Sequence, residues 1–200
     1  MKRFFRRHAT LWMLIGFCLL LGLFLSLRTG IFFTGRNLIN ILEANSFKLL
    51  LAIGMTFVIA SGGIDLSVGS ILSLSAIFTA LCMKQNIPVW LAILVGLLSG
   101  ILMGLINGAL IHFTGINAFI ITLGTSFLYR GLALIVTRGT PVSKLPAAYR
   151  AFGGGDIFQV ESGVYMALLV LLLSIPLLYK MRWGHYITTL GGNPVALRRC

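Results

Sequence analysis

The sequence predicts an all-α fold, a polytopic transmembrane helix bundle formed by a single domain over residues 1–200. Apolar residue types make up 58% of the chain, and its mean hydropathy is +1.00. Only 10% of the residues are charged, against about 25% in soluble domains. This composition excludes a soluble globular enzyme, and it excludes intrinsic disorder because disorder requires low hydrophobicity. A bilayer core needs about 20 apolar helical residues per crossing, so the chain has room for about six spans.

Six apolar segments follow one another along the chain. We expect spans at residues 9–27, 38–61, 66–83, 88–111, 116–136 and 163–179. The first follows the basic residues 2–7 and is too long for a signal peptide, so we expect it to be retained as a span. The second is strongly apolar only in its C-terminal half. Either its helix starts near Asn37 and includes Glu43 and Lys48, or the crossing is broken around residues 61–63.

The distribution of charge predicts the orientation. The chain carries 16 Lys and Arg against 4 Asp and Glu, which gives a net charge of +12. Most of the basic residues lie between apolar segments, where positive charge sets topology and contacts anionic lipid headgroups. The sequence contains no nucleic-acid-binding signature. The basic clusters at residues 2–7 and 180–200 both favour the cytoplasmic side. We therefore expect a cytoplasmic N-terminus and an outward-facing segment at residues 137–162.

The fourth expected span carries a regular stripe of glycines. Gly96, Gly100, Gly104 and Gly108 recur every four residues and share one face of a helix. Because helices in lipid attract one another mainly through close backbone approach, we interpret the stripe as a helix–helix seam. A glycine-lined solute path is the alternative. Asn107 lies beside the stripe, where its amide could bond a neighbouring helix or a polar substrate.

Two ionisable residues are expected close to membrane depth. Asp65 follows the glycines at residues 62–63, which permit a sharp reversal, and it lies where the third span begins. Its carboxylate can cap that helix, or it can mark a solute or hinge point, with the small hydroxyls of Ser67 and Ser70 beside it. Arg130 interrupts the fifth span, where we expect it to snorkel to the interface rather than face a pore.

Motifs for nucleotide, metal or covalent chemistry are missing from the sequence. It contains no phosphate-binding loop of the form G-x-x-x-x-G-K-[ST], no H-E-x-x-H and no G-x-S-x-G. Its 3 cysteines have no C-x-x-C spacing. We therefore expect no catalytic residue, metal or cofactor, and uphill transport would need a partner or an ion gradient. Since Asp65 is the only acidic residue clearly at membrane depth, self-sufficient ion coupling is disfavoured.

Several stretches resemble the permease subunits of ribose-type monosaccharide ABC importers. The matching stretches are NLINIL at 37–42, GMTFVI at 54–59, SGGIDLSVGS at 61–70, FIITLGT at 119–125, YRG at 129–131, GHY at 184–186 and GGNP at 191–194. They occur in the family's order and cover almost the whole chain. The resemblance implies an all-helical permease in the bacterial inner membrane. Members have about ten spans, so we expect this chain to be C-terminally truncated.

The resemblance also implies partners. In this family two permease copies, identical or different, pair over two cytoplasmic ABC ATPases, and an extracytoplasmic sugar-binding protein delivers the substrate. Residues 180–200 correspond to the cytoplasmic segment that docks on the ATPase. There Asn193 can cap a short helix starting at Pro194. The expected coupling residues are Gly191, Gly192, Asn193, Pro194, Ala196 and Arg198.

We therefore interpret the chain as the permease subunit of an importer for a monosaccharide such as ribose, galactose or xylose. Its substrate path needs polar, mostly uncharged walls that bind weakly. The candidates are Asp65, Ser67, Ser70, Asn107, Thr122 and Thr125. Three alternatives remain: the same family with autoinducer-2 as cargo, an ion-coupled secondary carrier, and a membrane subunit that does not transport.

Overall fold

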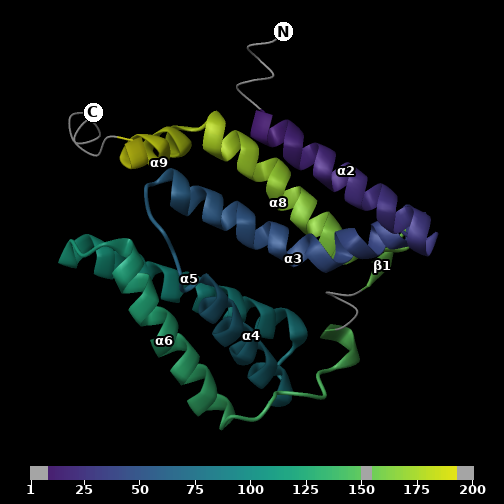
Figure 1. Ribbon diagram of the computed structural model, residues 1–200. Helices are drawn as coiled ribbons and strands as arrows, with labels where there is room; N and C mark the ends of the chain where they lie inside the picture. The colour runs from purple at the N-terminus through teal and green to yellow at the C-terminus, as the bar shows by residue number, and fades with distance from the viewer. Residues whose placement is uncertain (1–8, 150–154, 193–200) are drawn as a thin grey trace. The chain divides into compact units, whose positions relative to one another are not determined.

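The computed structural model describes residues 9–149 and 155–192 and confirms the all-α prediction (Figure 1). Within these residues the only sheet is a pair of two-residue antiparallel strands, β1 (Asp156–Ile157) and β2 (Val160–Glu161). The helices are α2 (Ala9–Thr29), α3 (Gly35–Ala60), α4 (Val68–Lys84), α5 (Val89–Thr114), α6 (Ala118–Thr137), α8 (Ser162–Tyr179) and α9 (Arg182–Gly192). The chain divides into two compact units, Met1–Ser46 and Phe47–Cys200.

The first unit contains α2 and the beginning of α3. The two helices are joined by a short connection in which Gly30 has a φ of +63°. The ring of Phe32 lies over Gly22, where an added Cβ would be 3.2 Å from its nearest ring atom. The side-chain amide of Asn37 donates a 2.8 Å hydrogen bond to the Phe32 carbonyl. Gly22 of α2 leaves room for the Phe32 ring, and the Asn37 side chain of α3 binds the Phe32 carbonyl. These two contacts hold the connection between α2 and α3 in place.

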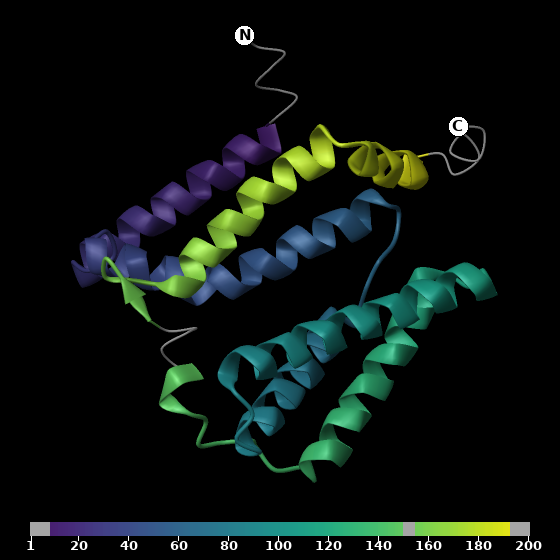
Figure 2. The ribbon, with the colours of Figure 1, turned by 180° about the vertical axis from the view of Figure 1, so that it is seen from behind.

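The core of the second unit lies among α4, α5 and α6, which pack closely in both ribbon views (Figures 1 and 2). Leu74 of α4, Met103 of α5, and Tyr129 and Ala133 of α6 form its buried cluster. Ile71, Ile77 and Phe78 of α4 pack against this cluster. The three helices are consecutive in sequence, so short connections keep each one beside the next.

The connections of this three-helix core follow ordinary capping rules. Gly115 ends α5 in the left-handed conformation, with a φ of +66°, and its N–H donates to the Ile111 carbonyl. Asn117 then caps α6, because its side-chain oxygen accepts a 2.9 Å hydrogen bond from the Phe119 N–H. Because Gly115 terminates α5 and Asn117 caps α6, the chain reverses direction within a few residues.

Five of the described helices are long and apolar enough to cross a membrane, namely α2, α3, α5, α6 and α8. The helix α4 is also apolar but shorter, with 17 residues. The helix α3 starts at Gly35 and includes both Glu43 and Lys48, as in the first of the two sequence alternatives. Its 26 residues extend about 39 Å, which exceeds the thickness of a hydrocarbon core. It then ends at Ala60, before the glycine turn.

Candidate functional site

A connected group of polar side chains begins at Asp65, in the link between α3 and α4. One carboxylate oxygen of Asp65 accepts hydrogen bonds from the Ser67 N–H at 2.7 Å and from the Ser67 hydroxyl at 2.6 Å. Ser67 is completely buried and directly precedes α4. The negative charge therefore lies at the N-terminus of α4, where it complements the helix dipole. Ser67 is the N-cap residue of α4, and its side chain makes no capping hydrogen bond. Asp65 precedes the cap and binds Ser67 itself, so the direct cap by Asp65 that one interpretation of the sequence predicted is not the arrangement found.

The group continues from Ser67 into α5 and α6. The side-chain amide of Asn107 donates a 2.7 Å hydrogen bond to the Ser67 hydroxyl oxygen. The Tyr129 hydroxyl lies 3.2 Å from the Asn107 side-chain oxygen and 3.2 Å from the Met103 carbonyl oxygen, so its proton has two acceptors. Asn107 and Tyr129 are both buried. Asp65, Ser67, Asn107 and Tyr129 thus form a chain of hydrogen bonds, called here the polar network.

Thr122 of α6 fixes the backbone next to this network. Its hydroxyl oxygen accepts a 3.1 Å hydrogen bond from the Leu66 N–H. The same hydroxyl lies within donor distance of the Ala118 carbonyl at 2.8 Å and the Ile64 carbonyl at 3.1 Å. Thr122 is almost completely buried. Since an unpaired buried N–H or carbonyl is costly in lipid, Thr122 supplies partners that the link residues cannot obtain from a helix of their own.

The structure brings together four of the six expected substrate-path residues. Asp65, Ser67, Asn107 and Thr122 meet at the link between α3 and α4, where they bond to one another or to the link backbone. The Ser70 hydroxyl bonds the Ser67 carbonyl, and the Thr125 hydroxyl bonds the Thr122 carbonyl, each within its own helix. That these six residues line a solute path stays a prediction.

Tyr129 is a member of the network that sequence reasoning missed. It lies seven residues after Thr122 and four after Thr125, so the three side chains share one face of α6. All three are buried. This repeat of polar residues on one face of an apolar helix is the sequence pattern that could have identified Tyr129. Arg130, the next residue, is exposed and therefore lies off this buried face.

The glycine stripe of α5 packs closely only over its first half. An added Cβ at Gly96 would overlap the Thr79 hydroxyl and lie 3.2 Å from the Ser75 carbonyl oxygen, both in α4. At Gly100 it would lie 3.2 Å from the Ser75 hydroxyl. At Gly104 and Gly108 it would meet nothing within 4 Å among the described residues. The contact between α4 and α5 is therefore made by the first two glycines of the stripe.

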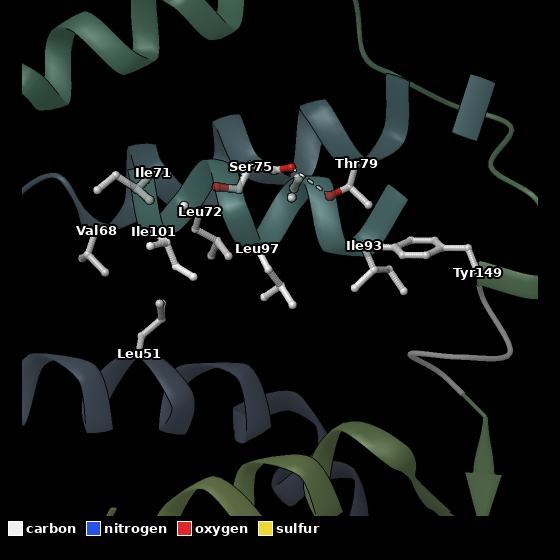
Figure 3. A pocket seen from close by; sticks show the side chains of 13 residues that line it. Leu51, Val68, Ile71, Leu72, Ser75, Thr79, Ile93, Leu97, Ile101 and Tyr149 are labelled. Atoms are coloured by element: carbon white, nitrogen blue, oxygen red, sulfur yellow. Dashed lines mark hydrogen bonds between the residues drawn. The ribbon is translucent and has the colours of Figure 1, made fainter. Parts of the chain in front are cut away.

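An apolar cavity of about 530 Å³ lies beside this contact (Figure 3). Leu51 of α3 borders it opposite Leu97 and Ile101 of α5, and Tyr149 closes one end. The Thr79 hydroxyl donates a 2.9 Å hydrogen bond to the Ser75 carbonyl, drawn as the dashed line. Among the described residues, the Ser75 hydroxyl is the one buried side-chain polar atom without a hydrogen-bond partner. Apolar walls of this kind suit hydrocarbon rather than a sugar.

A second cavity, of about 460 Å³, has more polar walls. It is bordered by Ser73 of α4, by Thr137 at the end of α6, and by Thr140 and Tyr149 in the following segment. The Thr137 and Thr140 hydroxyls donate to the Ala133 and Thr137 carbonyls, so their oxygen lone pairs remain able to accept. Hydroxyl groups beside an aromatic ring can bind a small polyhydroxylated solute weakly.

The expected coupling segment contains α9 in its described part. Gly191 and Gly192 are the last residues of α9. The N-cap expected at Asn193, the helix start at Pro194, and Ala196 and Arg198 lie outside the described residues. An added Cβ at Gly191 would overlap the Ala60 carbonyl oxygen at the end of α3, whereas at Gly192 it would meet nothing within 4 Å among the described residues. The two glycines therefore have different surroundings.

No group of three His, Cys, Asp or Glu side chains in the described part of the chain could hold a metal ion. The polar network contains one carboxylate and neutral hydroxyl and amide groups. Such a set can bind polar groups and hold helices together. It lacks the paired acid and base, or the nucleophile and base, that covalent chemistry uses.

Comparison with known proteins gives relatives over most of the chain. The D-allose transport system permease protein AlsC of Escherichia coli (strain K12) is 35% identical over 191 residues, covering 95% of this chain and 58% of that protein. The ribose import permease protein RbsC of the same strain is 35% identical over 171 residues, covering 84% and 53%. The autoinducer 2 import system permease protein LsrD of Klebsiella pneumoniae is 37% identical over 155 residues, covering 74% and 47%.

The chain spans about half the length of these relatives. No solved structure matches it. Residues 37–199 match the family described as branched-chain amino acid transport system / permease component. This match covers more than half of the chain and includes the polar network, and it agrees with the permease resemblance of the sequence motifs. The chain therefore belongs to this family of multi-pass membrane permease components.

Proposed function

We propose that the chain is the membrane permease subunit of an ABC importer for a monosaccharide. The observation that carries the proposal is its similarity, over 84–95% of its length, to permeases named for ribose and D-allose. The second cavity, whose mostly apolar wall carries the hydroxyls of Ser73, Thr137 and Thr140, is compatible with a polyhydroxylated cargo. In this proposal the chain moves the sugar and a separate cytoplasmic ATPase hydrolyses the nucleotide.

The proposed partners follow from the same similarity. They are a cytoplasmic ABC ATPase, an extracytoplasmic sugar-binding protein and a second permease copy, in the inner membrane of a bacterium. The N-terminus faces the cytoplasm in this proposal, so residues 180–200 meet the ATPase. The polar network holds α4, α5 and α6 together at the cytoplasmic end of the path, and the six path candidates reach the sugar when these helices separate.

An uptake assay tests this function. We expect a bacterial strain lacking its own ribose, allose and autoinducer-2 permeases to accumulate one of these labelled solutes when the chain is expressed with an ABC ATPase and a sugar-binding protein of a ribose-type importer. Because ATP drives the step, uptake should be lost with a hydrolysis-deficient ATPase and should persist when a protonophore dissipates the proton gradient.

The other outcomes distinguish the alternatives. Accumulation of autoinducer-2 alone would assign the other cargo that the relatives suggest. Uptake that needs no ATPase and collapses with the proton gradient would indicate an ion-coupled carrier. No uptake of any solute, with the protein present in the membrane, would indicate a subunit that does not transport.

A further inference from the structure

Helix α9 makes close contact with the backbone of other segments at two of its glycines. An added Cβ at Gly184 would overlap the carbonyl groups of Leu177 and Leu178, near the end of α8. At Gly191 it would overlap the Ala60 carbonyl oxygen at the end of α3. The two glycines are seven residues apart, which places them about two turns apart on one face of α9. Ile187 and Thr188 lie between them on this face, so direct contact with backbone is made at the two glycines.

The second contact is made with a turn that is itself held by hydrogen bonds. Gly62 has a φ of +82°, and an added Cβ there would lie 3.2 Å from the Gly191 Cα. The Gly62 N–H donates to the Ile59 carbonyl at 2.9 Å, and the Gly63 N–H donates to the Val58 carbonyl at 3.0 Å. Backbone therefore lies directly on backbone, with no flexible side chain to absorb a displacement of α9.

The same turn leads within two residues to the polar network. The Ile64 carbonyl lies 3.1 Å from the Thr122 hydroxyl. Asp65 then binds Ser67, which is bonded to Asn107. Every step from Gly191 to Asn107 is thus a backbone contact, a short stretch of chain or a hydrogen bond. A shift of the end of α9 must move this turn, and the turn is attached to the residues that join α4, α5 and α6.

We propose that Gly62 and Gly191 are positioning residues through which displacement of α9 changes the geometry of the polar network. This inference rests on the proposed function, in which α9 belongs to the segment that meets the ATPase. Closely packed elements move as rigid bodies. A displacement of α9 on docking is therefore transmitted to Asp65 through backbone contacts and is not absorbed by side chains changing rotamer. The energy of ATP hydrolysis then opens or closes the helix contacts around Asn107.

Hydrogen exchange in the purified, detergent-solubilised chain tests the mechanical link. We expect Gly191→Ala to raise amide exchange of a peptide covering residues 61–70 about fivefold or more, since couplings between sites are commonly of that size or larger. The N–H groups of Leu66 and Ser67, both hydrogen-bonded to side chains, report on the network. Gly54→Ala in α3 is the control, because its added Cβ meets nothing within 4 Å among the residues that the structure describes. Equal exchange in the two variants would overturn the proposal.

A reciprocal variant covers the case in which Gly191→Ala does not fold. Coupling between two sites acts in both directions. We therefore expect Asp65→Ala, which removes the acceptor of the two Ser67 hydrogen bonds, to raise exchange in the peptide covering residues 182–192 by a similar factor. Exchange there that stays at the level of the unmodified chain would contradict the link even if Gly191→Ala is lost.

The reconstituted transporter separates this inference from the proposed function. With the ATPase and binding protein present, we expect Gly191→Ala to retain ATP hydrolysis while sugar uptake falls at least about tenfold, whereas Gly54→Ala in α3, outside the coupling segment, keeps both. Equal loss of hydrolysis and uptake would indicate a damaged complex and reject the positioning role. If the unmodified chain transports nothing, the proposed function fails, and the hydrogen-exchange result still decides whether the link exists.

Discussion

At the scale of the residue, four polar side chains explain how an apolar helix bundle obtains a defined arrangement. Ser67, Asn107 and Tyr129 are buried, and each has a hydrogen-bond partner within the network. Lipid supplies no alternative partner, so separating the helices leaves these groups unsatisfied. Hydrocarbon packing is equally favourable in many registers, whereas this set of bonds is satisfied in one. The network therefore selects the arrangement of α4, α5 and α6.

Replacement of Asn107 tests that role. We expect Asn107→Ala to lower the free energy of unfolding by about 1–2 kcal/mol, because the Ser67 hydroxyl loses its donor and the Tyr129 hydroxyl loses one acceptor. Equilibrium unfolding in mixed detergent micelles measures the change. The neighbouring Gly108→Ala is the control, since its added Cβ meets none of the described residues within 4 Å and alanine favours the helix. An Asn107→Ala protein as stable as this control would show that the network contributes little.

At the scale of the element, the glycines of α5 are equally spaced in sequence, but only some of them contact α4. Gly96 and Gly100 let α5 approach the backbone of α4, whereas Gly104 and Gly108 have open space beside them as far as the described residues extend. The crossing of two helices limits close contact to a few residues before the axes diverge. One half of the stripe therefore stabilises the pair of helices, and the other half remains available for a different contact.

This difference predicts unequal effects for identical substitutions in one helix. Gly96→Ala should destabilise the protein by about 1–3 kcal/mol, because the new methyl group overlaps the Thr79 hydroxyl and crowds the Ser75 carbonyl. Gly104→Ala should leave stability unchanged or raise it. Thermal unfolding of both variants in the same detergent makes the comparison. Similar losses of stability would contradict the assignment of the α4–α5 contact to the first half of the stripe.

At the scale of the whole molecule, the chain is a multi-pass membrane protein whose orientation is predicted from charge. Basic residues flank the spans, and the clusters at residues 2–7 and 180–200 favour the cytoplasm. An even number of crossings between these clusters would place both on the same side. That requires the 17-residue helix α4 to cross together with the five longer helices.

Labelling of single cysteines tests the orientation. In a variant with the native cysteines replaced by serine, Lys144→Cys should react with a membrane-impermeant maleimide in intact cells, because residues 137–162 are expected outside. Arg182→Cys should react only after the membrane is permeabilised. Both positions are exposed in the structure, so access depends on the side of the membrane alone. The opposite pattern would invert the topology and place α9 away from any cytoplasmic ATPase.

The sequence by itself determined that the chain is an all-α membrane protein with several long apolar helices. It also indicated that Asp65 lies close to the start of a helix. These properties depend on local composition and on chemistry within a few residues. Only the tertiary structure decided that Tyr129 joins Asn107, that Gly96 rather than Gly108 meets α4, and that Gly191 lies on Gly62. Periodicity shows which side chains share a face, but the partner of that face depends on how distant segments pack in space.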